Sequence, residues 1–181
     1  MITEPVTAKT SLILGGARSG KSRRAEQLVD HTTGLRPNRR KIYMATAQID
    51  DDEMEARVGV HRARRDTTWT TVDVPLGLSE KLRNDVSGDD VVLIDCLTLW
   101  LSNLFSADLD IASETDKLIA SIAVSPATLV FVSNEVGLAI VPDNTLARAF
   151  RDAQGVLNQK VAAAVEHVEF VAAGLSIQLK P

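Results

Sequence analysis

Short apolar runs along this chain are separated by longer segments in which apolar residues recur every three or four positions. Uninterrupted apolar runs are typical of strands covered on both faces of a parallel sheet. They predict strands at residues 10–14, 41–45, 91–94 and 129–133, with weaker candidates at 69–74, 168–172 and 176–179. The helical spacing predicts helices at residues 21–30, 51–65, 78–86, 97–105, 113–123 and, most clearly, 145–166.

Alternation of strands and helices favours an α/β domain with a mainly parallel sheet and right-handed crossovers. Ligands of such sheets bind beyond the carboxyl ends of the strands. A polar stretch with an early proline, residues 1–9, is expected to form a flexible N-terminal tail. Residues 10–181 are then expected to form a single domain, because 181 residues are too few for two ordinary ones.

Composition narrows the class of protein. Hydrophobic residues make up 45% and charged residues 24% of the chain, as in soluble globular proteins, and no apolar run is long enough to span a bilayer. One cysteine, Cys96, and an N-terminus without a secretory pattern favour a cytoplasmic location. The formal net charge of −4 argues against nucleic acid as a partner.

A glycine-rich segment directly follows the first predicted strand. It reads Gly15-Gly16-Ala17-Arg18-Ser19-Gly20-Lys21-Ser22, and a helical pattern begins at Lys21. Strand, glycine loop and helix in this order are the context in which backbone N–H groups cradle phosphate oxygens. Lys21 would then reach the β- and γ-phosphates, and the Ser22 hydroxyl would bind Mg²⁺. This context favours an α/β, P-loop NTPase-like (RecA-like) fold over a glycine turn that binds nothing.

A carboxylate ends the buried run 91–94, as a partner for magnesium should. Asp95 is therefore the candidate metal ligand, and its alternative role is to cap the helix predicted at 97–105. The adjacent Cys96 is interpreted as a small buried packing residue.

The segment 51–65 changes from acidic to basic along its length, which suits the dipole of a solvated surface helix. Arg57, His61 and Arg64, however, share one stripe at i, i+4 and i+7, where like charges repel unless an anion lies nearby. A histidine in such a setting can attack phosphorus and form a covalent phosphoramidate. The residues alone leave both interpretations of His61 open.

Several further stretches accompany the loop and the histidine. They are Tyr43-Met44-Ala45-Thr46-Ala47-Gln48, Asp51-Asp52-Glu53-Met54, Ser133-Asn134-Glu135-Val136-Gly137, Ile140-Val141-Pro142, and Leu146-Ala147-Arg148-Ala149-Phe150-Arg151-Asp152 with Gly155, Asn158 and Gln159. From about Leu12 to Lys180 the chain resembles the bifunctional adenosylcobinamide kinase / adenosylcobinamide-phosphate guanylyltransferase family of cobalamin biosynthesis. The combination of motifs is far more specific than the glycine loop. Two positions depart from some members: Asp95, where they carry Glu, and Val60, where they carry a second histidine.

The resemblance implies two successive reactions. Adenosylcobinamide is first phosphorylated with ATP or GTP. His61 then attacks the α-phosphate of GTP, releases pyrophosphate and passes GMP to adenosylcobinamide phosphate, which gives adenosylcobinamide-GDP. Mg²⁺ with the nucleotide, and a homo-oligomer such as a trimer, are also implied.

The resemblance also extends the candidate site beyond the loop. The stretch Thr46, Ala47 and Gln48 matches a nucleotide-contacting segment, Arg18, Arg62 and Arg65 are candidate phosphate clamps, Asp73 is a candidate for reading guanine, and Asn134 and Glu135 are candidates for the second substrate or the metal. A helix cap is the competing explanation for Asn134 and Glu135.

The sequence is also compatible with other functions. The main rival is a different P-loop small-molecule kinase that forms no nucleotidyl-histidine. A nucleotide-dependent switch is disfavoured, because the chain has no Asn-Lys-x-Asp guanine-reading motif. A relative that has kept only one of the two activities is the third alternative.

Overall fold

The computed structural model describes residues 8–35, 38–48, 59 and 65–181. The strands are β1 (Thr10–Gly15), β2 (Arg40–Ala45), β3 (Trp69–Asp73), β4 (Asp90–Asp95), β5 (Thr128–Asn134), β6 (His167–Ala172) and β7 (Leu175–Lys180). The helices are α1 (Lys21–Gly34), α3 (Leu78–Asn84), α4 (Leu97–Ser106), α5 (Ile111–Val124) and α6 (Thr145–Ala164). Most of the predicted tail, residues 1–9, lies outside the described residues.

The strands form one seven-stranded sheet in the order β3-β2-β4-β5-β1-β6-β7. Every neighbouring pair is parallel except β6 and β7, which form an antiparallel pair at one edge. The chain therefore has the predicted α/β architecture, a mainly parallel sheet flanked by helices. The central strands β1, β4 and β5 are almost wholly buried, which explains their uninterrupted apolar sequence.

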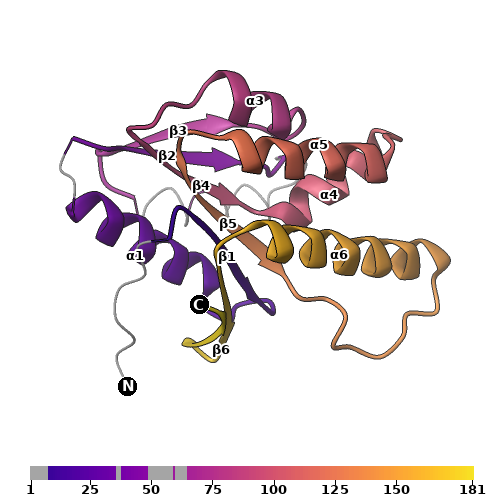
Figure 1. Ribbon diagram of the computed structural model, residues 1–181. Helices are drawn as coiled ribbons and strands as arrows, with labels where there is room; N and C mark the ends of the chain where they lie inside the picture. The colour runs from indigo at the N-terminus through magenta and orange to yellow at the C-terminus, as the bar shows by residue number, and fades with distance from the viewer. Residues whose placement is uncertain (1–7, 36–37, 49–58, 60–64) are drawn as a thin grey trace.

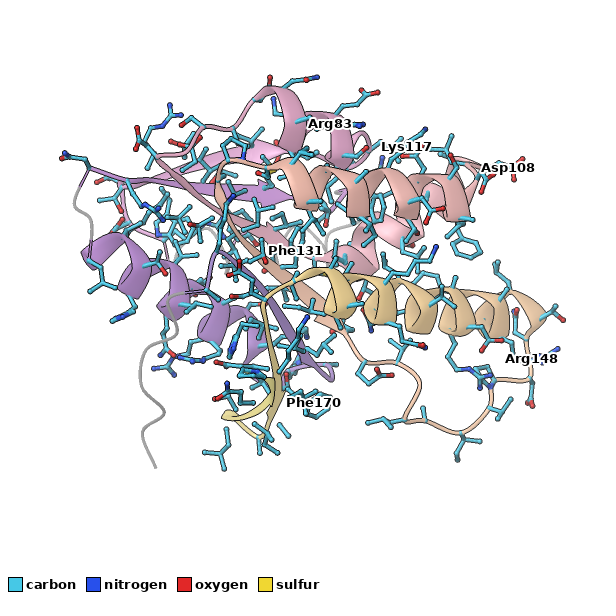
Figure 2. All side chains as sticks on the ribbon, in the orientation of Figure 1. Arg83, Asp108, Lys117, Phe131, Arg148 and Phe170 are labelled. Atoms are coloured by element: carbon cyan, nitrogen blue, oxygen red, sulfur yellow. The ribbon has the colours of Figure 1, made fainter. Side chains whose placement is uncertain are left out.

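Helices cover both faces of the sheet (Figure 1). On one face α3, α4, α5 and α6 pack on a core that includes Trp100 and Phe131, both fully buried. Figure 2 shows Phe131 between the sheet and this helical layer. On the other face the apolar side of α1 packs on strand residues such as Ile13 and Val130. No helix of the described residues is long and apolar enough to cross a membrane.

Two helix boundaries differ from prediction. Helix α1 continues past Asp30 to Gly34, where the Leu35 N–H still donates to the His31 carbonyl at 3.2 Å. The Thr32 and Thr33 hydroxyls donate to the carbonyls of Leu28 and Val29. His31 therefore lies inside this helix. Helix α6 ends at Ala164, shortly before the predicted 166, where β6 begins at His167.

An ion pair fastens the start of α1 to β6. Arg24 binds both carboxylate oxygens of Glu169, at 2.6 and 2.7 Å, and His167 Nε2 lies 3.0 Å from the same carboxylate. Burial would raise the pKa of Glu169, but the hydrogen bonds and charges of Arg24 and His167 outweigh it and lower that pKa to about 2. The pair of Arg24 and Glu169 thus attaches the first turn of α1, directly after the glycine loop, to the sheet.

This pair makes stability depend on pH. The pKa of Glu169 is lowered on folding, so its contribution is complete above about pH 5 and is lost as the pH falls toward 2. Arg24→Met should cost about 3 kcal/mol at pH 7, because it leaves a buried carboxylate without its main partner. The cost should shrink at pH 3, which urea unfolding at both pH values measures. Arg23→Met, an exposed neighbour, is the control; equal stability of the two variants at pH 7 would contradict the account.

Candidate active site at the carboxyl edge of the sheet

The carboxyl ends of β1 to β6 meet at one edge of the sheet, because these strands are parallel. Gly15 at the end of β1 is level with Asn134 on β5, and Ala45 on β2 is level with both Asp73 on β3 and Asp95 on β4. Strand ends far apart in sequence thereby come together. Among the described residues, the candidates in the glycine loop lie at this edge together with Thr46, Asp73, Asp95 and Asn134.

The glycine loop turns sharply between β1 and α1. Arg18 and Gly20 have φ angles of 55° and 101°, both left-handed, and no side chain caps the start of α1. An uncapped helix start offers backbone N–H groups and a positive dipole end to an anion. Lys21, 8% exposed, folds back so that its Nζ donates to the Gly16 carbonyl at 3.0 Å. The Ser19 hydroxyl is buried and has no hydrogen-bond partner among the described residues.

The turn between β6 and β7 supports this loop from behind. The Gly174 N–H donates to the Ser19 carbonyl at 2.8 Å. A Cβ added to Gly20 would lie 3.3 Å from the Gly174 Cα, and one added to Gly15 would lie 2.4 Å from the Val171 carbonyl oxygen. Sequence reasoning missed this contact, because nothing local marks Ser19 and Gly174, which are 155 positions apart, as neighbours.

The two glycines at the start of the loop should respond differently to substitution. Gly15→Ala forces its methyl group against Val171 and Ser19, whereas a Cβ on Gly16 meets nothing within 4 Å. We expect Gly15→Ala to lose about 2 kcal/mol of stability and to weaken nucleotide binding, since the backbone must move. Gly16→Ala is the matched control for packing and should unfold like the wild type. Thermal unfolding measures both; equal losses would contradict the geometry.

Asp95 is the last residue of β4 and interacts with β2. It accepts a hydrogen bond from the Tyr43 hydroxyl at 3.0 Å, and the Arg65 guanidinium lies over the Tyr43 ring at 3.4 Å from its centroid. Burial, and then the Asp95 charge, raise the pKa of Tyr43 far above its ordinary value, so its hydroxyl remains a donor. Helix α4 is capped at Cys96 rather than at Asp95, so the alternative role of Asp95 as the cap of that helix is wrong. Its role as a metal ligand stays a prediction.

Buried polar contacts fix the loops beside Asp95. The Thr46 hydroxyl donates to the Cys96 carbonyl at 2.7 Å and accepts from the Cys96 N–H at 2.8 Å. Asn103 on α4 donates to the carbonyls of Thr46 and Pro75, at 2.7 and 2.9 Å. The loops after β2 and β3 are thus held together by one amide that the sequence pattern did not single out.

Cys96 itself has the environment of a packing residue. Burial, reinforced by the Asp95 charge and opposed by weaker influences that include Lys21, raises the pKa of the Cys96 thiol to about 11. A thiol with this pKa is a poor nucleophile at neutral pH.

A second buried network holds the end of β5. Ser133, Gln154 and Asn158 share hydrogen bonds of 2.6 to 3.0 Å, and Asn158 Nδ2 donates to the Asn134 carbonyl at 3.0 Å. Helix α6 begins much later and is capped by Asn144, so Asn134 and Glu135 do not cap it. The Glu135 carboxylate accepts from the Gly137 N–H at 2.6 Å. Both residues therefore stay candidates for contact with a ligand.

Some of the predicted site residues lie outside the described part of the chain, and others lie at its surface. His61 and Arg62 lie outside the described residues, as do Arg57 and Arg64. Among the clamps, Arg18 is exposed on the glycine loop and Arg65 is half-buried against Tyr43. Asp73 is exposed at the end of β3, and Ala47 and Gln48 follow β2 at the same edge.

The donor set suits a hard cation. A serine hydroxyl, Ser22, and a carboxylate, Asp95, are oxygen donors of the kind that Mg²⁺ prefers, and these two side chains would hold it. Among the described residues no group of three or more His, Cys, Asp or Glu side chains could hold a metal ion.

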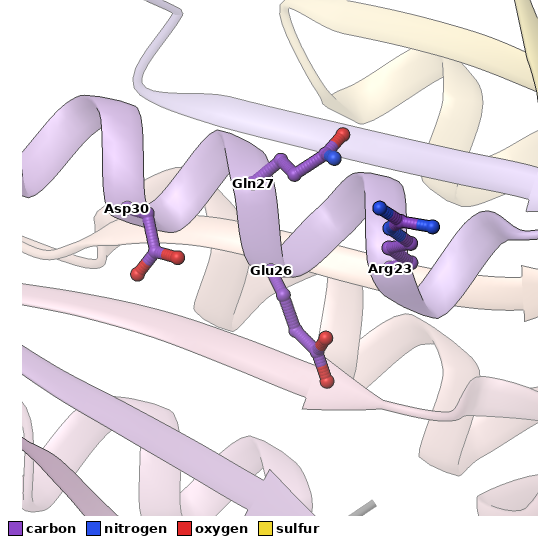
Figure 3. Close-up of a pocket in the computed structure, with 4 residues that line it drawn as sticks. All are labelled: Arg23, Glu26, Gln27 and Asp30. Carbon is purple, nitrogen blue, oxygen red and sulfur yellow. The ribbon is translucent and has the colours of Figure 1, made fainter. Parts of the chain in front are cut away.

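One surface hollow lies elsewhere. It is lined by Arg23, Glu26, Gln27 and Asp30, which form one stripe of α1 (Figure 3). None of these residues belongs to the glycine loop or to the loops that follow β2 to β5.

Comparison with known proteins agrees with the fold and the motifs. In fold, the chain resembles the flagellar accessory protein FlaH of Methanocaldococcus jannaschii, with a TM-score of 0.56 at 12% identity over 97% of this chain and 80% of that one. In sequence, it is 44% identical to the bifunctional adenosylcobalamin biosynthesis protein CobP of Pseudomonas aeruginosa, over 93% of this chain and 96% of the relative. It is 40% identical to the corresponding protein CobU of Escherichia coli, over 93% and 98%. The family model described as cobinamide kinase / cobinamide phosphate guanyltransferase matches residues 11–179, and the chain belongs to this family.

Proposed function

We propose that this chain is a bifunctional enzyme of adenosylcobalamin biosynthesis. It phosphorylates adenosylcobinamide with ATP or GTP and then transfers GMP from GTP to the product, which gives adenosylcobinamide-GDP. Membership of the cobinamide kinase / cobinamide phosphate guanyltransferase family supports both activities. The observation that carries the proposal is the glycine loop at the start of the uncapped helix α1, with Lys21 folded over it.

In the kinase step the loop residues 15–22 hold the triphosphate. Lys21 moves from the Gly16 carbonyl to the β- and γ-phosphates, and Arg18 adds positive charge at the rim of the loop. Ser22 and Asp95 would hold Mg²⁺, which neutralises charge on the phosphates when bound. The hydroxyl of the substrate forms a bond with the γ-phosphorus as the bond to the β-phosphate oxygen breaks. Asn134 and Glu135 contact the second substrate or the metal.

In the transfer step an imidazole nitrogen of His61 forms a bond with the α-phosphorus of GTP. The bond to pyrophosphate breaks, and the phosphate of adenosylcobinamide phosphate then displaces His61 from GMP. Arg62 and Arg65 clamp phosphate oxygens, Thr46, Ala47 and Gln48 contact the nucleotide, and Asp73 accepts the guanine N1 and N2 protons. The contact between Arg65 and Tyr43 supports this step, because it holds a candidate clamp against a side chain that is hydrogen-bonded to Asp95.

We also propose a location, an oligomeric state and a domain division for the enzyme. We expect a cytoplasmic homo-oligomer such as a trimer, with residues 1–9 as a flexible tail on the domain 10–181. Leu138, Ile140 and Val141 are 83%, 94% and 61% exposed, and apolar residues so exposed are typical of surfaces that pack on another chain. Light scattering of the purified protein measures the oligomeric state.

Product analysis tests the function directly. The protein is incubated with adenosylcobinamide, Mg²⁺ and either ATP or GTP, and the corrinoids are identified by mass spectrometry. ATP alone should give adenosylcobinamide phosphate, and GTP should carry the product on to adenosylcobinamide-GDP. Phosphorylation that never proceeds to the GDP product with GTP would reduce the function to a kinase.

A further inference from the structure

Tyr43 joins two parts of the proposed site and is the single tyrosine of the chain. Its hydroxyl donates to Asp95 Oδ2 at 3.0 Å. The guanidinium of Arg65 covers its ring face at 3.4 Å, and the ring of Trp69 meets its ring at 76° with centroids 6.4 Å apart. Tyr43 is 5% exposed, so these contacts are shielded from bulk water. One buried side chain thus contacts the candidate metal carboxylate and a candidate phosphate clamp.

The hydroxyl has a consequence for Asp95. A hydrogen bond to one oxygen of a carboxylate restricts rotation of the group about its bond to Cβ. Partners of this kind behind a metal ligand orient it, and their loss weakens metal binding by about ten- to a hundredfold. The phenol is suited to this task because its hydroxyl donates a hydrogen bond and adds no charge.

The ring has a separate consequence for Arg65. Arg65 follows His61 by four residues along the chain. A guanidinium over an aromatic face is held by cation–π attraction, which is stronger where water is excluded. The stack therefore fixes the guanidinium that the proposed function places on phosphate oxygens in the transfer step.

We propose that Tyr43 is a positioning residue that holds Asp95 and Arg65 in a fixed relation, and so couples the metal ligand of the kinase step to a phosphate clamp of the transfer step. This inference rests on the proposed function for the roles of Asp95 and Arg65. Its two contacts are separable, because phenylalanine keeps the ring and loses the hydroxyl, whereas leucine loses both.

Two variants separate the contacts by kinetics. Tyr43→Phe should raise the Mg²⁺ concentration for half-maximal kinase activity about tenfold. Its rate of His61 guanylylation at saturating Mg²⁺ should stay near that of the wild type, because the stack on Arg65 remains. Tyr43→Leu should also slow guanylylation about tenfold at saturating Mg²⁺. Trp69→Phe is the matched control, because it changes a neighbour of Tyr43 and leaves both contacts in place.

A spectroscopic measurement avoids dependence on turnover. Protein that carries 3-fluorotyrosine should show one ¹⁹F resonance, since Tyr43 is the single tyrosine. Titration of Mg²⁺ in the presence of GTP should shift that resonance, and Asp95→Asn should displace it and remove the response to Mg²⁺. Urea unfolding confirms that each variant is folded.

The proposal is overturned if folded Tyr43→Phe keeps the Mg²⁺ dependence of the wild type, or if the resonance ignores Mg²⁺ with GTP. It is equally overturned if Tyr43→Leu is guanylylated as fast as Tyr43→Phe. The proposed function fails in a different way, because wild-type protein would then make neither corrinoid product while the ¹⁹F titration still reports on Tyr43.

Discussion

Replacement of Lys21 by methionine should abolish both activities together. The ammonium group already contacts the loop backbone, through the Gly16 carbonyl at 3.0 Å. Methionine keeps the length of the side chain and removes the charge that stabilises phosphate in both transition states. We expect a loss of about 100- to 1000-fold in kcat/KM for phosphorylation and for transfer. Steady-state assays of the two corrinoid products measure it.

The control for this variant is a lysine on the opposite helical layer. Lys117 on α5 forms a surface ion pair with Glu114 at 2.7 Å, and Figure 2 shows it beside α5 on the side toward α3. Lys117→Met should retain both activities, because an exposed pair contributes little to stability. A Lys21→Met enzyme that loses one activity and keeps the other would contradict a shared phosphate site.

Replacement of His61 by asparagine should separate the two reactions. Asparagine is polar and similar in length but cannot form a phosphoramidate that turns over. We expect formation of adenosylcobinamide-GDP to fall by at least about 1000-fold, as for removal of other nucleophiles. Phosphorylation of adenosylcobinamide should continue, since the glycine loop is unchanged. Product analysis of the variant with GTP therefore should show the phosphate accumulating.

The chain offers a matched histidine control. It has three histidines, and His31 lies in α1 away from the described strand ends. His31→Asn should make both products at the rate of the wild type. His167 is unsuitable as a control, because it is buried against Glu169. Continued synthesis of the GDP product by His61→Asn would refute the role of this residue.

The sequence predicted the elements well where local pattern and burial coincide. Strands β1, β4 and β5 are buried on both faces, so their apolar runs could be read directly. The same runs predicted that Asp95 and Asn134 lie at one edge of the sheet, because parallel strands have their carboxyl ends at the same edge. The glycine loop was recognisable because strand and helix flank it immediately.

Contacts between distant segments could not be predicted in the same way. The turn at Gly174 supports the loop at Ser19, and Arg24 pairs with Glu169, through an antiparallel hairpin added after the last helix. Neither contact has a local signature. Asn103 likewise reads as one polar residue on an apolar helix, although its amide joins two loops. The role of the Tyr43 hydroxyl could not be predicted either, because Tyr43 lies in the apolar carboxyl-terminal half of β2 and is typical of a packing residue there.

The most direct test of the account is covalent labelling with GTP that carries ³²P at the α-phosphate. Purified protein is incubated with this GTP and Mg²⁺, denatured, separated on a gel and treated with acid or base, beside His61→Ala. We predict an acid-labile, base-stable label in the wild type, mapped by peptide mass spectrometry to His61 and absent from the variant. Folded protein that binds GTP but takes up no label would contradict the guanylyl-histidine route and favour a kinase without a covalent intermediate.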